Sequence, residues 1–261
     1  MVLTTGAATD VGRVRERNED SAMADRTVFV VADGIGGHAA GEVASRIVAD
    51  AIRELADRPQ LRAEDVVSQL SLANERILAS VGQHPEQSGM GTTAAGLAVV
   101  TAGGSEHWAV FNVGDSRVYR YLDGALALVT VDHSQVRELL DAGAIAEADV
   151  ARHPLRNVIT RSLGTEPMGV PDVWVFPPQP GERFLICSDG LSNELSVDQI
   201  RDIIEANSTA QMAADALVRA AVTAGGRDNV TAIVVGLDRG VIDEEADEDT
   251  ARRSDDVGAG W

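Results

Sequence analysis

The sequence predicts an α+β fold: an α-β-β-α layered sandwich in which two mostly antiparallel sheets are flanked by helices. Strand-like segments form blocks in both halves of the chain, and helical segments long enough to cover two sheet faces lie between and after them. The strand-like segments of residues 92–131 are joined by connections too short for a parallel crossover, which needs about a dozen residues or more. The chain has 261 residues, 44% of them hydrophobic, so it can bury a core of this size.

The first half predicts one buried strand, two helices and a set of short strands. Residues 27–33 (TVFVVAD) are apolar and β-branched and run into a glycine cluster. Residues 39–56 and 63–81 carry apolar side chains at helical spacing. From Thr92 the period changes to two. It predicts strands over 92–100, 106–114, 116–122 and 125–131, the last two joined by an Asp123-Gly124 turn.

The second half predicts a surface subdomain, then strands and helices that complete the sandwich. Residues 133–165 are polar and helical, and we expect them to form this surface subdomain. Helices are expected to begin at Ser196 and Ser208, because each is followed three residues later by a glutamine, as in a capping box. Strands are predicted over 170–176, 182–189 and 229–237.

The composition divides the chain into one domain, residues 1–237, and a tail. Residues 238–261 hold nine acidic and three basic side chains without apolar periodicity, and we expect this acidic tail to be disordered.

Charge and residue usage exclude several functions. The net charge of −19 disfavours binding to nucleic acid or to an anionic membrane. The chain contains no lysine, so P-loop and Schiff-base chemistry lack their residue. Cys187 is the single cysteine, which fits a reducing compartment. No run approaches the roughly eighteen apolar residues of a membrane span, so we expect a cytoplasmic protein.

Four aspartates lie where predicted strands meet turns: Asp33, Asp115, Asp189 and Asp228. Any one of them could be an ordinary turn residue. Four carboxylates close to a core repel one another unless a cation lies between them, and oxygen-only ligands suit Mg²⁺ or Mn²⁺. The pattern therefore favours a metal site.

Two further motifs allow more than one interpretation. The segment 9–21 (TDVGRVRERNEDS) is either a solvated loop with balanced charges or a place where an arginine meets a phosphoryl group beside more carboxylates. The segment GIGGHA matches a dinucleotide-binding turn and allows an NAD(P)-binding oxidoreductase as an alternative. That match is weak, since Asp33 would face the pyrophosphate and no βαβ alternation follows.

Eight motifs, in order, resemble those of bacterial protein phosphatase 2C-type (PPM family) metal-dependent serine/threonine protein phosphatases. The resemblance covers about residues 4–237. The motifs are D-x-G-x-x-R-x-x-N-E-D (Asp10 to Asp20), VVADGIGGHAAGEVAS, GMGTTAAG, NVGDSRVY, DHSQVRELLDAG, HPLRNVITRSLG, LICSDGLSNELS and GGRDNVT.

The resemblance implies a role for each candidate residue. Asp33 matches the carboxylate that bridges two metals, with the Gly34 carbonyl on one ion and Asp189 and Asp228 on the other. Asp115 matches the ligand of a third, weaker metal site, near the mobile flap that residues 133–165 would form. The remaining matches are Glu19 and Asp20, which resemble an acidic pair holding metal-bound waters, and Arg15, which resembles the arginine that binds substrate phosphate.

The resemblance also implies an activity. Two Mn²⁺ or Mg²⁺ ions would share a water that attacks the phosphorus of phosphoserine or phosphothreonine in proteins, and the weaker site would hold a third ion. The implied partners are phosphorylated proteins and a cognate bacterial Ser/Thr kinase, and we expect a monomer. A phosphoprotein-binding module without turnover is a further alternative, which the full set of aspartates argues against.

Overall fold

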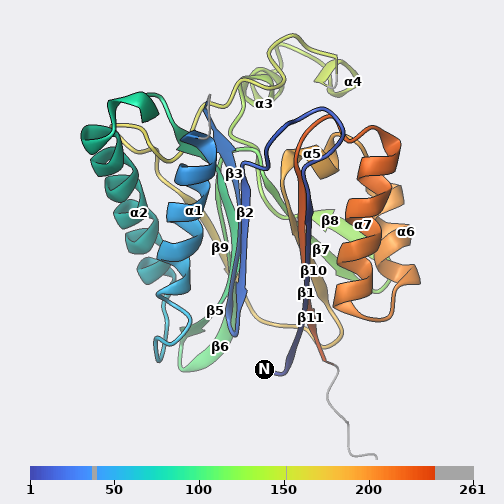
Figure 1. Ribbon diagram of the computed structural model, residues 1–261. Coiled ribbons are helices and arrows are strands. Elements are labelled where there is room, and N and C mark those ends of the chain that lie inside the picture. Colours follow the sequence, from blue (N-terminus) through green and yellow to red (C-terminus); the bar gives the residue numbers. More distant parts are fainter. Residues whose placement is uncertain (37–39, 151, 239–261) are drawn as a thin grey trace, which may run out of the picture.

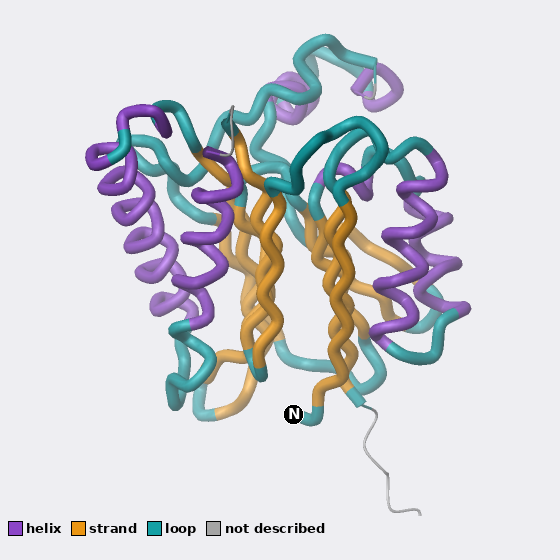
Figure 2. Tube along the Cα trace, in the orientation of Figure 1, coloured by secondary structure: helices purple, strands orange, loops and turns teal. Residues whose placement is uncertain are grey.

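The computed structural model describes residues 1–36, 40–150 and 152–238, which form four layers (Figure 1). Two sheets pack face to face in the middle, and a pair of helices covers the outer face of each (Figure 2). Every strand pair in the two sheets of these residues is antiparallel. The predicted α+β sandwich of two mostly antiparallel sheets is confirmed, and the βαβ unit that a dinucleotide-binding turn requires is not present in the described residues.

The first sheet joins strands from both ends of the chain in the order β1-β11-β10-β7-β8. Asp10 at the end of β1 pairs with Val230 at the start of β11, so the segments that follow β1 and precede β11 meet at one edge. The strands are β1 (Leu3–Asp10), β7 (Arg117–Leu122), β8 (Ala125–Leu128), β10 (Arg183–Cys187) and β11 (Val230–Leu237).

The second sheet has the order β2-β3-β5-β6-β9, and the short β4 pairs with the end of β3. Its strands are β2 (Asp20–Asp25), β3 (Val28–Ile35), β4 (Gly91–Thr92), β5 (Ala94–Ala102), β6 (Ser105–Val113) and β9 (Asp172–Phe176).

Side-chain alternation along the strands divides the apolar core into three parts. In β3, Val28 and Val30 pack towards the helices, whereas Phe29 and Val31 pack against the first sheet. Because successive side chains point to opposite faces, Asp33 continues the face that looks towards the first sheet. On this face of β3, the apolar side chains packed between the two sheets are therefore followed directly by the carboxylate of Asp33.

Helices cover the outer faces and close one end of the sandwich. α1 (Ala40–Arg53) and α2 (Ala63–Gln83) cover the second sheet, and α6 (Val197–Ala206) and α7 (Ala210–Ala224) cover the first (Figure 1). The predicted flap, residues 133–165, contains α3 (Gln135–Asp141) and α4 (Glu147–Val150) and lies above the sheets in Figure 1. Its movement stays a prediction. The remaining short helices are α5 (Asp189–Ser192) and a 3₁₀ turn, η1 (Pro85–Gln87).

The structure corrects the predicted start of α7. Ser196 caps α6 with Gln199 as predicted, through the Ser196 Oγ and Gln199 N pair at 3.3 Å. In α7 the N-cap is Thr209 rather than Ser208, and its Oγ1 accepts from Met212 N at 3.1 Å. Gln211 does not complete a capping box, because its amide bonds both backbone groups of Ala7 in the neighbouring β1.

The structure contains two strands that the sequence did not predict and shortens another. β1 and β2 were not predicted, and the last predicted strand of the 92–131 block ends at Leu128 rather than at residue 131. No helix in the described part of the chain combines the length and apolar character needed to cross a membrane. The predicted acidic tail, 238–261, lies outside the described residues except for Asp238.

Candidate metal centre

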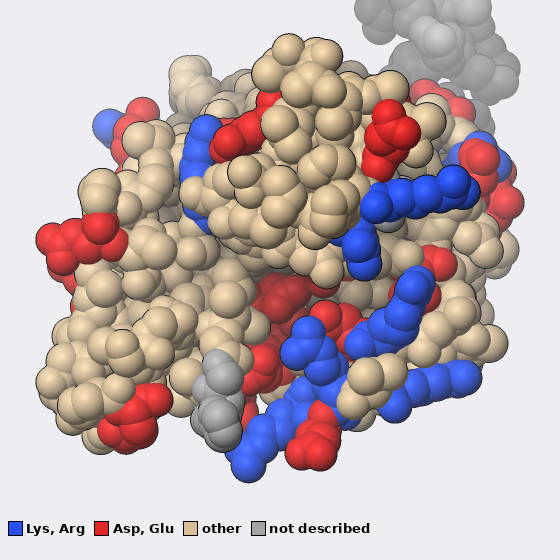
Figure 3. Space-filling view, turned by 90° about the horizontal axis from the view of Figure 1, so that it is seen from above, with Lys and Arg blue, Asp and Glu red and all other residues tan. Residues whose placement is uncertain are grey.

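The acidic candidates collect at one edge of the seam between the two sheets. Asp20 begins β2 and lies opposite Asp33 of β3 in the antiparallel register. Asp115 follows β6, Asp189 opens α5 directly after β10, and Asp228 precedes β11. Asp33 lies inside β3 rather than at its end, which corrects the predicted strand boundary. Seen from above, acidic side chains lie in a hollow of the surface (Figure 3).

Asp20 and Asp33 form the floor of this site, and both are half-buried. Ser188 Oγ, at the end of β10, donates to Asp20 Oδ2 at 2.8 Å, which ties the second sheet to the first. Asp20 Oδ1 is buried without a hydrogen-bond partner among the described residues. A buried carboxylate oxygen without a partner is costly, so Asp20 is a position where a cation would stabilise the fold.

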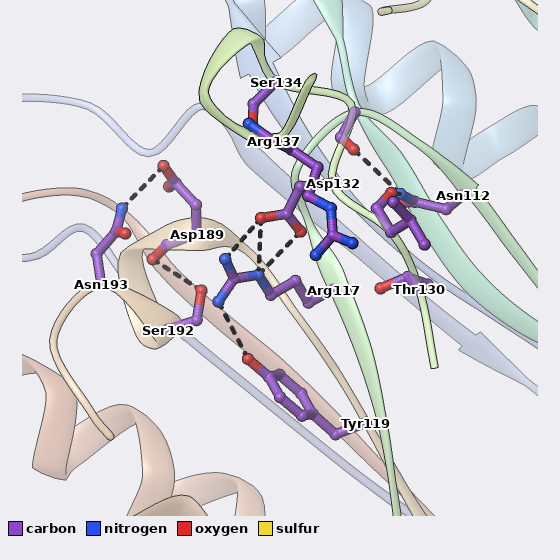
Figure 4. A network of polar contacts seen from close by, with 12 residues as sticks. Asn112, Arg117, Tyr119, Thr130, Asp132, Ser134, Arg137, Asp189, Ser192 and Asn193 are labelled. Atoms are coloured by element: carbon purple, nitrogen blue, oxygen red, sulfur yellow. Dashed lines mark hydrogen bonds and ion pairs between the residues drawn. The ribbon is translucent and has the colours of Figure 1, made fainter. Parts of the chain in front are cut away.

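Asp189 and Asp228 carry protein partners in this structure. Asn193 Nδ2 donates to Asp189 Oδ2 at 3.0 Å, and Figure 4 shows these two side chains pointing towards each other. Arg15 Nη2 lies 2.7 Å from Asp228 Oδ2, with the arginine side chain 49% exposed and the aspartate 35% exposed. An ion pair this accessible to water contributes little to stability and exchanges partners easily.

Asp115 lies near an ion pair between Arg117 of β7 and Asp132, the residue just before the predicted flap. Arg117 donates from Nε and Nη2 to the Asp132 carboxylate, at 2.9 and 2.6 Å, and its Nη1 contacts the Tyr119 hydroxyl (Figure 4). Burial first, and then the charges of Asp189 and Asp132, raise the pKa of Asp115. Arg117 is the nearby positive charge, and it lowers the pKa of Asp115.

Glu19 and Gly34 bring the second sheet against the start of α1. Gly34 N donates to Glu19 O at 3.2 Å, and Ser45 Oγ of α1 donates to the same oxygen at 2.6 Å. A Cβ at Gly34 would collide with the Gly41 carbonyl, so only glycine allows α1 to approach β3 this closely. The Glu19 side chain lies over Gly41 at the start of the helix.

Burial and mutual repulsion raise the pKa of nearly every carboxyl group in the cluster. Burial raises the pKa of Asp20 and of Asp115 to about 7, and neighbouring aspartates add to each shift. The pKa of Asp33 lies well above its ordinary value, because of burial first and then the charge of Asp20. Burial and Asp228 raise the pKa of Asp189. Groups of one sign that destabilise each other in this way are suited to a shared cation.

The donor set fits a hard divalent ion, although the ligand shell is not assembled. No three His, Cys, Asp or Glu side chains in residues 1–36, 40–150 and 152–238 stand as a group that could hold a metal ion. Asp189 and Asp228 are paired with Asn193 and Arg15 instead. Asp189 already lies within reach of the Asp33 carboxylate. A bound ion would take the place of Arg15 at Asp228, and the partnerless Asp20 oxygen and the oxygen-only donors would attract it.

Asn229 positions the Arg15 loop and was not predicted. Its Nδ2 donates to the carbonyls of Val11 and Arg17, at 2.9 and 2.8 Å, and its Oδ1 accepts from Glu19 N at 2.9 Å. Gly12, with a φ of 79°, passes against the Asp228 carbonyl where a Cβ would collide. The loop that carries Arg15 is thereby fastened to the segment that carries Asp228.

Two other positioning residues were also missed. Thr93 Oγ1 accepts from Asp33 N at 2.9 Å and pairs with Ser116 Oγ at 2.7 Å, which links Asp33 to the Asp115 segment. His133 Nδ1 accepts from Gly114 N at 3.1 Å, and its Nε2 lies 3.1 Å from Asp172. In the sequence, the only features that single out Thr93 and His133 are their positions within the motifs GMGTTAAG and DHSQVRELLDAG.

Comparisons with known proteins show the family to which the chain belongs. The family model described as protein phosphatase 2C matches residues 13–223. The chain belongs to the protein phosphatase 2C family. Over 241 residues it is 37% identical to the serine/threonine protein phosphatase PstP of Mycobacterium tuberculosis, covering 91% of this chain and 45% of PstP. Over 240 residues it is 35% identical to the serine/threonine phosphatase stp of Listeria welshimeri, covering 87% of this chain and 93% of that protein.

Solved structures of this family share the fold. The M. tuberculosis PstP/Ppp phosphatase structure superimposes with a TM-score of 0.85 at 35% identity, covering 91% of this chain and all of that one. A structure of the PstP catalytic domain in complex with two manganese ions has a TM-score of 0.79 at 34% identity and covers 90% of this chain and 99% of that one. The chain thus spans less than half the length of PstP and nearly the full length of the Listeria relative.

Proposed function

We propose that this chain is a metal-dependent protein phosphatase that hydrolyses phosphoserine and phosphothreonine in proteins. The observation that carries the proposal is the half-buried pair Asp20 and Asp33, with one Asp20 oxygen buried without a partner among the described residues, at the same sheet edge as an exposed arginine, Arg15. Buried carboxylates attract divalent metal ions, and a water-accessible guanidinium suits a phosphate dianion. Membership of the protein phosphatase 2C family supports the same activity.

We assign two Mn²⁺ or Mg²⁺ ions to this site, with a weaker third. When bound, they supply the Lewis acidity that makes water a nucleophile near neutral pH and neutralises charge on the phosphoryl group. Asp33, the Gly34 carbonyl, Asp189 and Asp228 would hold the two ions. Glu19 and Asp20 would order their water ligands, and Asp115 would hold the third ion.

The chain's own residues then bind and orient the substrate. Arg15 would leave Asp228 for the phosphate oxygens, and its exposed ion pair makes that exchange inexpensive. Asn229 keeps the Arg15 loop fixed while the side chain turns. Cys187 is no nucleophile, because it is fully buried and burial raises the pKa of its thiol to about 12. No residue of the site needs to form a covalent bond with the substrate.

The partners and the location belong to the same proposal. We propose that the substrates are proteins phosphorylated by a cognate Ser/Thr kinase, that the chain acts as a monomer, and that it works in the cytoplasm. Names of the relatives as serine/threonine phosphatases support the substrate class, and the single, buried cysteine is compatible with a reducing compartment.

Hydrolysis of p-nitrophenyl phosphate tests the proposed activity. After treatment with EDTA, the protein should release p-nitrophenol only when Mn²⁺ or Mg²⁺ is added back. Turnover that is unchanged by EDTA would contradict the metal-dependent mechanism, and the absence of turnover in either metal would contradict the activity itself.

Replacing Arg15 by alanine should weaken phosphate binding by about 1.5–3 kcal/mol, the value of a hydrogen bond to a charged group. The inhibition constant of inorganic phosphate should rise accordingly, and the melting temperature should change little because the Arg15–Asp228 pair is exposed. Arg62→Ala, at the exposed N-cap residue of α2, serves as the control. An unchanged inhibition constant would remove Arg15 from the phosphate site.

The pKa shifts predict how metal binding depends on pH. Asp20 and Asp115 have folded-state pKa values of about 7, above the ordinary value, so the metal-free protein loses stability as pH rises from about 4 to about 7. Metal ions must displace these protons, so they bind more weakly below pH 7. We expect the Mn²⁺-induced rise in Tm, relative to EDTA, to be larger at pH 8 than at pH 5.5 by about 5 °C or more. An equal rise at both pH values would contradict the protonated cluster.

A further inference from the structure

The loop between β1 and β2 carries two arginines, one on each side of Arg15, that the proposed mechanism does not use. Arg13 and Arg17 are both exposed. Twelve arginines of the described residues form ion pairs with carboxylates, whereas Arg13 and Arg17 form none with any described residue. Five other described arginines also lack such an ion pair, but Arg13 and Arg17 are the two that lie on the loop that carries Arg15.

The backbone holds both arginines next to the site. Arg13 N donates to Gly226 O at 2.7 Å, and the Arg17 carbonyl accepts from Asn229 Nδ2 at 2.8 Å. Both contacts lie within two residues of Asp228. The aliphatic stem of Arg13 lies against Gly226, where a Cβ would be 3.2 Å from Cγ, which directs its charged end outward.

Arg227 is close in sequence but has a different role. Its Nε and Nη2 bind both oxygens of Glu194, at 2.8 and 3.0 Å, and the Glu194 side chain is only 4% exposed. This arginine neutralises a buried carboxylate, so its charge is not available to a ligand. Arg13 and Arg17 remain as the cations of this loop that can take a ligand.

The charge distribution decides which ligand suits them. The chain as a whole repels acidic peptides, but charges separated by more than about 10 Å are largely screened at 0.1 M salt, so the nearest side chains dominate. Figure 3 shows arginine side chains along one border of the acidic hollow. Guanidinium groups pair with carboxylates in a bidentate geometry, whereas a basic peptide would be repelled by the same border.

We propose that Arg13 and Arg17 form a recognition surface for acidic residues next to the phosphorylated residue, so that the site favours acidic phosphopeptides. The inference rests on the proposed phosphatase activity and adds a substrate class to it. Arg15 binds the phosphate, and the arginines two residues before and after it bind the flanking carboxylates.

The test compares two phosphothreonine peptides that differ only in having glutamate or glutamine on both sides of the phosphorylated residue. The variant Arg13→Gln/Arg17→Gln lowers the net charge by two, and Arg62→Glu lowers it by the same amount far from the site, at the start of α2. With Mn²⁺ and low salt, the double variant should lose about three- to tenfold in kcat/KM for the glutamate peptide, mainly through KM, as expected for two exposed ion pairs.

Three control measurements distinguish a failure of this inference from a failure of the proposed phosphatase activity. Turnover of p-nitrophenyl phosphate and of the glutamine peptide should be unchanged in the double variant, and Arg62→Glu should resemble the wild type. Equal kcat/KM of the wild type for both peptides, or an equal loss in Arg62→Glu, would overturn the recognition surface while leaving the phosphatase intact. Absence of all turnover in the wild type would overturn both.

Discussion

The variant Asp33→Asn should lose roughly 10³-fold or more in turnover, equivalent to about 4 kcal/mol of activation free energy, and should remain folded. Asp33 is the carboxylate at the centre of the cluster, opposite Asp20 in the register. An amide of the same shape keeps the β3 backbone contacts but removes the charge that we propose binds metal. Turnover of p-nitrophenyl phosphate in saturating Mn²⁺ is the measurement.

We expect Asp33→Asn to lower turnover but not to lower the stability of the metal-free protein. Burial and Asp20 hold the pKa of Asp33 well above its ordinary value, so ionising it costs stability in the metal-free protein as pH rises through that value. In EDTA at pH 8 the Tm of Asp33→Asn should equal or exceed that of the wild type, and Mn²⁺ should raise it less. Asp50→Asn, in an exposed pair with Arg53, controls for the loss of one charge. A misfolded variant, or one with normal turnover, would contradict the assignment.

The variant Asn229→Ala should lose both stability and activity. It leaves Glu19 N and the carbonyls of Val11 and Arg17 without their partners, which we expect to cost about 2–4 kcal/mol of unfolding free energy. It also releases the loop that orients Arg15 beside Asp228. Misplacement of a binding group by about 1 Å can cost about 10²-fold in rate, so kcat/KM should fall by roughly that factor.

Urea unfolding and steady-state kinetics measure the two effects of Asn229→Ala. Asn207→Ala is the control, because its amide makes a single bond, to Ile203 O at the end of α6. The control should cost about 1 kcal/mol or less and leave kinetics unchanged. Equal effects in the two variants would show that Asn229 does not position the loop.

The sandwich could be predicted because its main signals are local. The β-branched run at residues 27–33 and the alternating segments after Thr92 follow from side-chain periodicity, and short connections allow only antiparallel pairing. β1 and β2 have no such signal. They are rich in small and polar residues and lie at the sheet edges, where only part of each strand is buried.

The site could be predicted in part because carboxylates near strand ends are unusual. The structure brings Asp20 and Asp33 face to face and places Asp228 against Arg15, but Asn229, Thr93 and His133 could not be found in this way. Their residue types are common in turns and strands, and their roles arise from partners far away in the sequence. Asn229, for example, contacts a loop more than two hundred residues earlier.

The central claim is that the carboxylate cluster binds the divalent ions on which phosphoester hydrolysis depends. The most direct measurement is phosphate release from a phosphothreonine peptide by EDTA-treated protein as Mn²⁺ is titrated back. The structure predicts no release without metal, saturable recovery with Mn²⁺, and no recovery in Asp33→Asn. Full release in EDTA, or recovery by Asp33→Asn equal to the wild type, would contradict the claim.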